Sequence, residues 1–80
     1  MTSIHSTQQL GMVLRAARKQ LDITQSQLAL AAGVGPRFIV DLEAGKPTLR
    51  LENVLRVIDV LGGELNLSGL PVIEGGDRGA

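Results

Sequence analysis

The stretch from Thr24 to Gly45, TQSQLALAAGVGPRFIVDLEAG, contains the local signals for two short helices separated by a tight turn. Thr24 is followed three residues later by Gln27, the spacing of a capping box, in which two side chains each satisfy a backbone donor at a helix start. Gly33 is the residue type that ends a helix in a left-handed conformation without steric strain. Gly35 and Pro36 then open a second helix, because proline is already set for the first helical position. We therefore predict a helix-turn-helix over this stretch.

Small and apolar residues occupy the positions where these two helices must pack. Ala29 is small where the helices should approach closely, and Val34 fills the space between them. Ile39 and Leu42 are spaced to anchor the second helix to a core. The segment therefore meets each mechanical requirement of the motif.

Two longer helices are expected on either side. Ser6 and Gln9 repeat the capping-box spacing, and the helix that follows has an apolar face made of Leu10, Val13, Leu14, Ala17 and Leu21. After the motif, Thr48 is predicted to cap a helix that ends at Gly62 and whose apolar face is made of Leu51, Val54, Leu55, Ile58 and Leu61. Val57 and Val60 widen that face, so we assign both to an interface with a second copy; a fully covered core helix is the alternative.

Polar and apolar residues alternate in the segment ELNLS, residues 64–68, which is typical of a half-buried strand. A lone strand cannot satisfy its own backbone groups. We therefore predict that residues 63–69 pair with the same strand of a second copy, which would bury Leu65 and Leu67.

Composition excludes several classes of function. The chain of 80 residues has no cysteine, so it can form neither a disulfide nor a thiolate metal site. His5 is the only histidine, and although it neighbours Ser6, nothing supplies the oriented base and oxyanion site that catalysis needs. No apolar run approaches the roughly 20 residues of a membrane span. We expect a soluble, cytoplasmic protein that is not an enzyme and binds no cofactor or metal, with an aliphatic all-α core.

Charge is unevenly distributed along a chain whose net charge is zero. Residues 15–50 contain six basic and three acidic side chains, whereas residues 51–80 contain two basic and five acidic ones. Zero net charge disfavours nucleic-acid binding, but this distribution would let one part meet phosphates and the other a protein. Ordinary solvated charge on a helical surface is the alternative explanation.

The fixed spacings of the motif resemble those of the Cro/C1-type (XRE) repressor family. The matching residues are Thr24, Gln25, Leu28, Ala29, Gly33, Val34, Ile39, Leu42, Glu43 and Gly45. Within that family the chain is most similar to the small antitoxins of the HipB type, a likeness that includes the lead-in from Ile4 to Leu10. The resemblance implies an all-α, lambda-repressor-like helix-turn-helix domain with a short C-terminal strand that pairs across a homodimer.

The same resemblance implies binding to double-stranded DNA at a palindromic operator, and a kinase-like toxin as a further candidate partner. Three functions stay open at this point: an autoregulating antitoxin, a stand-alone transcriptional regulator, and an interaction module that binds no DNA. The expected division of the chain is an N-terminal arm at 1–5, the DNA-binding domain at 6–62, the dimerisation strand at 63–69 and a flexible tail at 70–80.

Candidate DNA contacts follow from the family pattern and from helix geometry. Gln25 lies at the positive end of a helix and should contact a phosphate. Arg37 should enter the major groove, where a guanidinium can bind guanine O6 and N7. Asp41 either accepts a hydrogen bond from cytosine N4 or pairs with Arg37 four residues earlier. Phe38 either touches a thymine methyl or packs in the core.

Other residues are further candidates for contacts to DNA. Thr24 and Gly35 belong to the same surface, and Lys46, with Arg50 and Arg15, could contact phosphates that position the domain. Arg18 and Glu43 match an ion pair of the family and are assigned a structural role. The family often has polar side chains where this chain has Gly35, Pro36 and Val40, so base reading should rest on fewer residues or on DNA shape.

Overall fold

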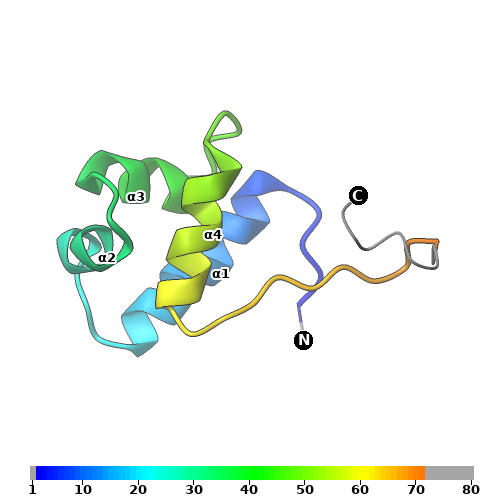
Figure 1. Cartoon of the computed structure of the whole chain (residues 1–80), viewed down its shortest axis with the longest axis horizontal. Helices are drawn as coiled ribbons and strands as arrows, with labels where there is room; N and C mark the ends of the chain where they lie inside the picture. The colour runs from blue at the N-terminus through cyan, green and yellow to red at the C-terminus, as the bar shows by residue number, and fades with distance from the viewer. Residues whose placement is uncertain (1, 72–80) are drawn as a thin grey trace.

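A computed structural model describes residues 2–71, and the helices of this part of the chain surround one core (Figure 1). In chain order they are α1 (Thr7–Gln20), α2 (Gln25–Ala32), α3 (Pro36–Glu43) and α4 (Leu51–Val60). α2 and α3 lie together at one end of the molecule, α4 crosses in front of α1, and the terminal segments extend at the other end. The predicted all-α helix-turn-helix fold is confirmed.

The helix starts agree with the sequence signals at α1, α2 and α3 but differ at α4. Thr24 and Gln27 form the predicted capping box, with bonds of 3.0 and 2.8 Å. At α1, Ser6 Oγ accepts a bond from the Gln9 amide, but the Gln9 side chain accepts from the amide of His5 instead of that of Ser6.

Thr48 does not cap α4. The helix begins one residue after Arg50, whose side chain makes no capping bond. Leu49, in the non-helical segment between Thr48 and Arg50, packs against the core cluster.

All four helices of residues 2–71 end on a residue in the left-handed conformation. Three use a glycine, as predicted, whereas α1 ends with Asp22 at φ 58°. In each case the amide of the following residue bonds to a carbonyl five residues earlier, which defines a Schellman motif. These amide donors are Ile23, Val34, Lys46 and Gly63. The shared ending explains the short connection between α2 and α3, because the chain reverses within a single turn.

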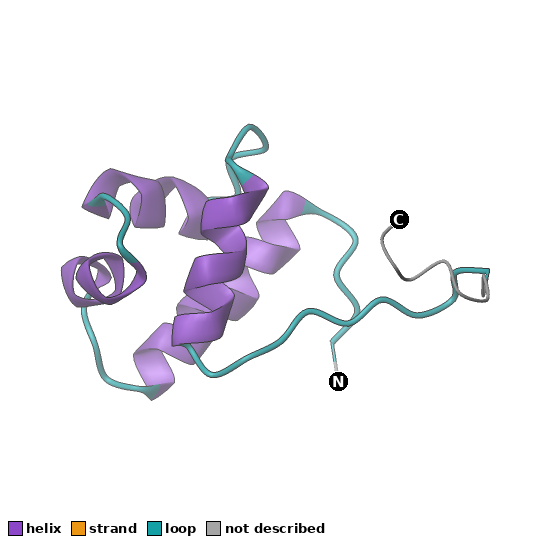
Figure 2. Ribbon diagram, viewed as in Figure 1, coloured by secondary structure: helices purple, strands orange, loops and turns teal. Residues whose placement is uncertain are grey.

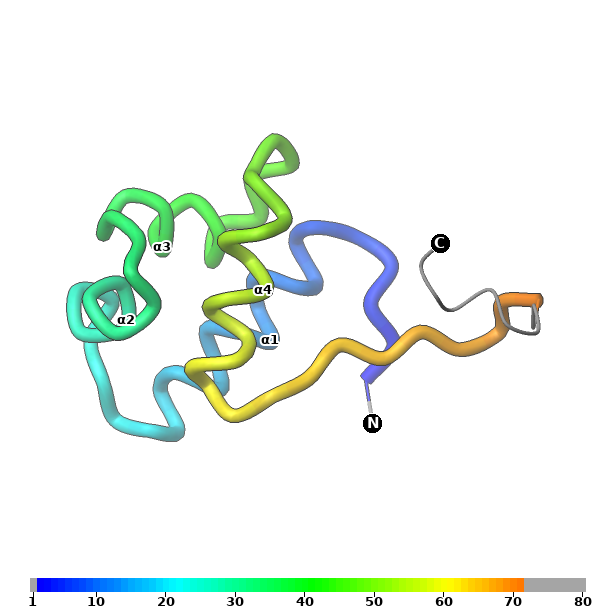
Figure 3. Tube along the Cα trace, viewed as in Figure 1, coloured from blue at the N-terminus to red at the C-terminus, as the bar shows by residue number. Residues whose placement is uncertain are grey.

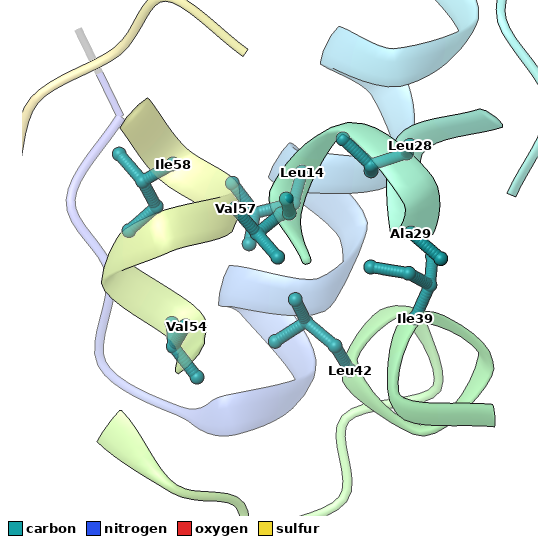
Figure 4. Close-up of a cluster of buried hydrophobic side chains, with 9 residues drawn as sticks. Leu14, Leu28, Ala29, Ile39, Leu42, Val54, Val57 and Ile58 are labelled. Carbon is teal, nitrogen blue, oxygen red and sulfur yellow. The ribbon is translucent and has the colours of Figure 1, made fainter. Parts of the chain in front are cut away.

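The core consists of buried aliphatic side chains from all four helices (Figure 4). They are Leu14, Leu28, Ala29, Ala32, Ile39, Leu42, Val54, Val57 and Ile58. Val57 is 0% exposed. Its assignment to a dimer interface is therefore wrong, since its side chain is enclosed by the core of its own subunit. Val60, by contrast, is exposed at the surface of α4.

α1 crosses the end of α3 at very short range. A Cβ added at Gly11 would lie 2.5 Å from the carbonyl oxygen of Leu42 and 2.7 Å from that of Glu43. Next to this crossing, Thr7 Oγ1 donates a 2.7 Å hydrogen bond to the carbonyl oxygen of Gly45. Only glycine allows this approach, which fixes α3 relative to α1.

Beyond Leu61 the described chain runs away from the helices without regular secondary structure (Figures 2 and 3). Residues 63–69 do not form a strand within this single subunit, because a strand needs a neighbouring backbone to bond with. Leu65 and Leu67 are exposed there. Pairing with a second copy stays a prediction, and residues 72–80 of the predicted tail lie outside the described residues. Within residues 2–71, no helix is long and apolar enough to cross a membrane.

Candidate nucleic-acid interface

α3 has one face in the core and one in solvent. Ile39 and Leu42 are buried, and Phe38 is half-buried against the same cluster. The core alternative therefore describes where Phe38 lies in the subunit. Arg37 and Val40 are on the exposed face, because residues three apart share a side of a helix.

Asp41 lies between two cations on this exposed side. Its Oδ1 is 3.1 Å from Arg37 Nε, and its Oδ2 is 3.6 Å from Lys46 Nζ. The Arg37 side chain is 83% exposed and that of Asp41 is only 16% exposed. Each carboxylate oxygen thus faces a cation, and the i,i+4 pair with Arg37, one of the two alternatives for Asp41, is present in the subunit.

Glu43 joins α3 to both preceding helices. Its carboxylate accepts hydrogen bonds of 2.6 and 3.0 Å from Arg18 Nε and Nη2, and one of 3.1 Å from Gln25 Nε2. Arg18 Nη1 in turn donates to the carbonyl oxygen of Ile23 at 2.8 Å. The Glu43 side chain is 4% exposed, so this network is part of the interior. Its position matches the structural role that the family resemblance implies for the Arg18–Glu43 pair.

Hydrogen bonding determines the charge state of this network. Burial acts to raise the pKa of Glu43, but the hydrogen bonds from Arg18 and Gln25 and the charges of Arg18 and Arg15 outweigh it and lower that pKa. The pKa of Arg18 is raised, chiefly by its hydrogen bond to Glu43 and against the opposing effect of burial. The pair therefore stays ionised.

Gln25, a predicted phosphate contact, has a side chain that is already engaged within the subunit. It is half-buried at the first position of α2, and its side-chain nitrogen is bonded to Glu43. This bond was not predicted, because the two residues are far apart along the chain and no local pattern joins them. A contact from Gln25 to a phosphate would have to use the second hydrogen of its side-chain nitrogen or its backbone N–H.

The remaining candidates lie on the surface around α3. Thr24, Gly35, Lys46, Arg50 and Arg15 are all exposed. Gly35 precedes α3, Lys46 follows it, and Arg50 precedes α4. Among these exposed cations, Lys46 thus lies just beyond the C-terminal end of α3. In the described part of the chain, no group of three His, Cys, Asp or Glu side chains could hold a metal ion.

A family model described as Helix-turn-helix matches residues 14–67 of this chain. The chain belongs to the Cro/C1-type helix-turn-helix family. Over 58 residues it is 48% identical to the uncharacterized HTH-type transcriptional regulator y4mF of Sinorhizobium fredii, a match that covers 72% of this chain and 76% of y4mF. The family resemblance seen in the sequence is confirmed.

Solved structures of helix-turn-helix proteins share the fold. A chain from the HipA-HipB-O2-O3 complex superposes with a TM-score of 0.78 at 25% identity, covering 84% of this chain and 94% of that one. The restriction-modification controller protein C.AhdI of Aeromonas hydrophila gives a TM-score of 0.66 at 26% identity, covering 72% of this chain and 84% of C.AhdI.

Membership of the Cro/C1-type family gives each of the two helices of the motif a role. In the family the second helix of the motif enters the major groove and the first crosses the DNA backbone. α3 is the second helix and α2 the first. The protein is therefore a DNA-binding transcriptional regulator of this family.

Proposed function

We propose that the protein is a sequence-specific repressor that binds a palindromic operator as a homodimer. The observation that carries the proposal is the exposed side of α3, where Arg37 projects into solvent beside Asp41 while the opposite side is held in the core. The major groove admits an α-helix, and an arginine on its outer face can bind guanine O6 and N7. Arg37 is the residue assigned to that contact.

A dimer is supported by the apolar surface at the end opposite α2 and α3. A groove of about 370 Å³ lies between α1, α4 and the two terminal segments. Its lining includes Ile4, Val13, Ile58, Leu61 and Leu65. Two recognition helices about 34 Å apart would then face successive turns of DNA, and doubling the contacts offsets the small number of cations in each subunit.

Within this function, we assign the protein to the autoregulating antitoxins of type II toxin–antitoxin pairs, with a kinase-like toxin as partner. The support is the similarity to HipB, which spans 94% of a chain found in complex with HipA. A stand-alone regulator is the second candidate, favoured by the similarity to y4mF and to the controller protein C.AhdI. Co-expression with the product of the adjacent gene separates them. Co-elution supports the antitoxin, and its absence supports the stand-alone regulator.

DNA binding is tested by selecting duplexes from a random pool with the full chain, then titrating the selected duplex by fluorescence anisotropy at two salt concentrations. Arg37→Ala should weaken binding by about 1–3 kcal/mol and relax the preference at one base position. Arg56→Ala is the matched control, because Arg56 also lies in an exposed i,i+4 ion pair, with Glu52, but on α4. If Arg37→Ala binds as tightly and as selectively as the parent, the assignment of α3 is wrong. If no duplex shows salt-dependent binding, the chain is an interaction module that does not bind DNA.

The dimer has its own test. Leu65→Lys combined with Leu67→Lys should give a monomer in light scattering, because both exposed side chains belong to the proposed pairing strand. Leu30→Lys, at an 84% exposed position on α2, should leave the dimer intact. A dimer that persists in the double variant rejects this interface.

A further inference from the structure

The outward face of α3 is mainly apolar. Val40 and Asp41 lie three and four residues after Arg37, and the capping residue Ala44 lies three residues after Asp41; only Asp41 among them is largely covered. Val40, an apolar residue on this solvent-facing side, is 36% exposed. Pro36, at the start of the helix, is also exposed and apolar. A helix that reads DNA with this face has one strong hydrogen-bonding side chain and an apolar surface beside it.

The carboxylate of Asp41 is positioned to orient the Arg37 side chain and not to hydrogen-bond a base. Both of its oxygens already face cations, at 3.1 Å from Arg37 Nε and 3.6 Å from Lys46 Nζ. Since Nε is the Arg37 nitrogen nearest to the carboxylate, the outer edge formed by Nη1 and Nη2 is left for another partner. A guanidinium held in this way loses less conformational freedom when it binds guanine.

Val40 restricts what can lie next to that guanine. Its branched side chain has one strongly preferred rotamer in a helix, so its methyl groups have fixed positions. A polar base edge pressed against them would lose its hydrogen bonds to water without replacement. In the major groove, the C5 methyl of thymine is the base-edge group that makes a favourable apolar contact. Residues three apart on a helix are about 5–6 Å apart at Cβ, and successive bases are about 3.4 Å apart, so the two contacts fall on neighbouring base pairs.

We propose that Val40 determines specificity by contacting the methyl group of a thymine one or two base pairs from the guanine bound by Arg37, with Asp41 as the positioning residue of Arg37. The inference rests on the proposed function, because it assigns what the same surface reads. Each operator half-site then contains a guanine and a nearby thymine.

Uracil substitution in the selected operator tests this directly, because it removes only the methyl group. Each thymine is replaced in turn, and the full-length protein is titrated by competition anisotropy. Loss of one buried methyl corresponds to about a fourfold weakening, and about fifteenfold when both half-sites are substituted. Val40→Ala should bind the parent operator more weakly and be insensitive to that uracil. Leu30→Ala, the matched truncation of an exposed aliphatic residue on α2, should keep the full sensitivity.

Asp41→Asn separates positioning from base reading. It should reduce the preference for guanine over 7-deazaguanine at the Arg37 position while leaving affinity for non-operator DNA unchanged or raised, since one negative charge is removed. A changed preference at a cytosine position instead would make Asp41 a base reader and overturn its assignment.

The outcomes for Val40 are distinct from those for the proposed function. Failure to select any operator refutes the proposed function itself. An operator with no thymine near the guanine, with no methyl-sensitive thymine, or with the same sensitivity in Val40→Ala as in the parent overturns the role of Val40 and leaves the repressor function standing.

Discussion

Replacing Arg18 by methionine should remove a large part of the free energy of unfolding of this domain. Methionine keeps an unbranched apolar stem, but it removes the donors to Glu43 and to the Ile23 carbonyl. Glu43 would keep only the bond from Gln25 while its side chain stays 4% exposed. Removing one partner of a buried ion pair costs about 3–5 kcal/mol, because the other charge is left without compensation.

That loss is large for a chain of this size. Small domains are stable by about 5–15 kcal/mol, and 1 kcal/mol corresponds to about 4–8 °C in Tm for 60–100 residues. Urea unfolding followed by far-UV circular dichroism, at one fixed protein concentration, measures the difference. Lys19→Met is the control, because Lys19 is exposed on the same helix and its loss should change stability by less than about 0.5 kcal/mol.

The dependence on pH gives the sharper test. In the parent, the pKa of Glu43 is lowered, so its stabilising contribution is present above the unfolded-state pKa of about 4.3 and is lost as the pH falls through the lower folded-state value. In Arg18→Met, burial of the Glu43 carboxyl should dominate and raise its pKa. Protonation of Glu43 then removes the free-energy cost of a buried, uncompensated charge. The deficit of the variant should therefore narrow as the pH is lowered from 7 toward 5. A deficit below about 1 kcal/mol, or one that does not change with pH, would refute the description of Glu43 as a buried carboxylate held by Arg18.

Three further substitutions test the backbone geometry by urea unfolding. Gly11→Ala should lower the free energy of unfolding by about 1–3 kcal/mol, because its Cβ would meet the Leu42 carbonyl; helix propensity alone would raise it, so a gain contradicts the close crossing. Asp22→Gly should raise stability by about 0.5–1 kcal/mol by relieving a left-handed aspartate, and a loss would mean that Asp22 makes a stabilising contact. Thr24→Ala should lower stability by about 1 kcal/mol while Thr24→Ser retains it; equal loss in both variants would show that the hydroxyl cap is not responsible.

Sequence reasoning succeeded where the signal is local. The cap at Thr24, the turn at Gly33 and the ion pair of Arg37 with Asp41 each depend on residues within four positions of one another. It failed where a distant residue decides. Thr48 has the chemistry of a helix cap, but the helix begins only after Arg50, and Leu49 packs against the core in the non-helical segment between them.

The apolar face of α4 shows the same limit. The pattern reveals that Val57 is apolar and on a wide face, but it does not reveal whether the covering surface comes from the same subunit or from another. The core of the subunit covers Val57 completely. Gly11 was missed for a related reason, since a glycine inside a helix signals a close approach only when the opposing backbone is known. The Arg18–Glu43 pair spans 25 positions and was expected only from the family resemblance.

The residues that hold α3 in place and the side chains assigned to DNA are different ones. Leu42 and Glu43 fix it from the core side, through the crossing with α1 and the bonds to Arg18 and Gln25. Arg37 and Val40 project outward and contribute little to the fold. Arg37→Ala and Val40→Ala should therefore change the free energy of unfolding by less than about 1 kcal/mol while altering DNA affinity. Arg18→Met should do the reverse at temperatures where it remains folded, keeping the base preference of the parent. If Arg18→Met, measured while folded, changes the preferred base at the Arg37 position, the two sets of residues are coupled and this separation is wrong.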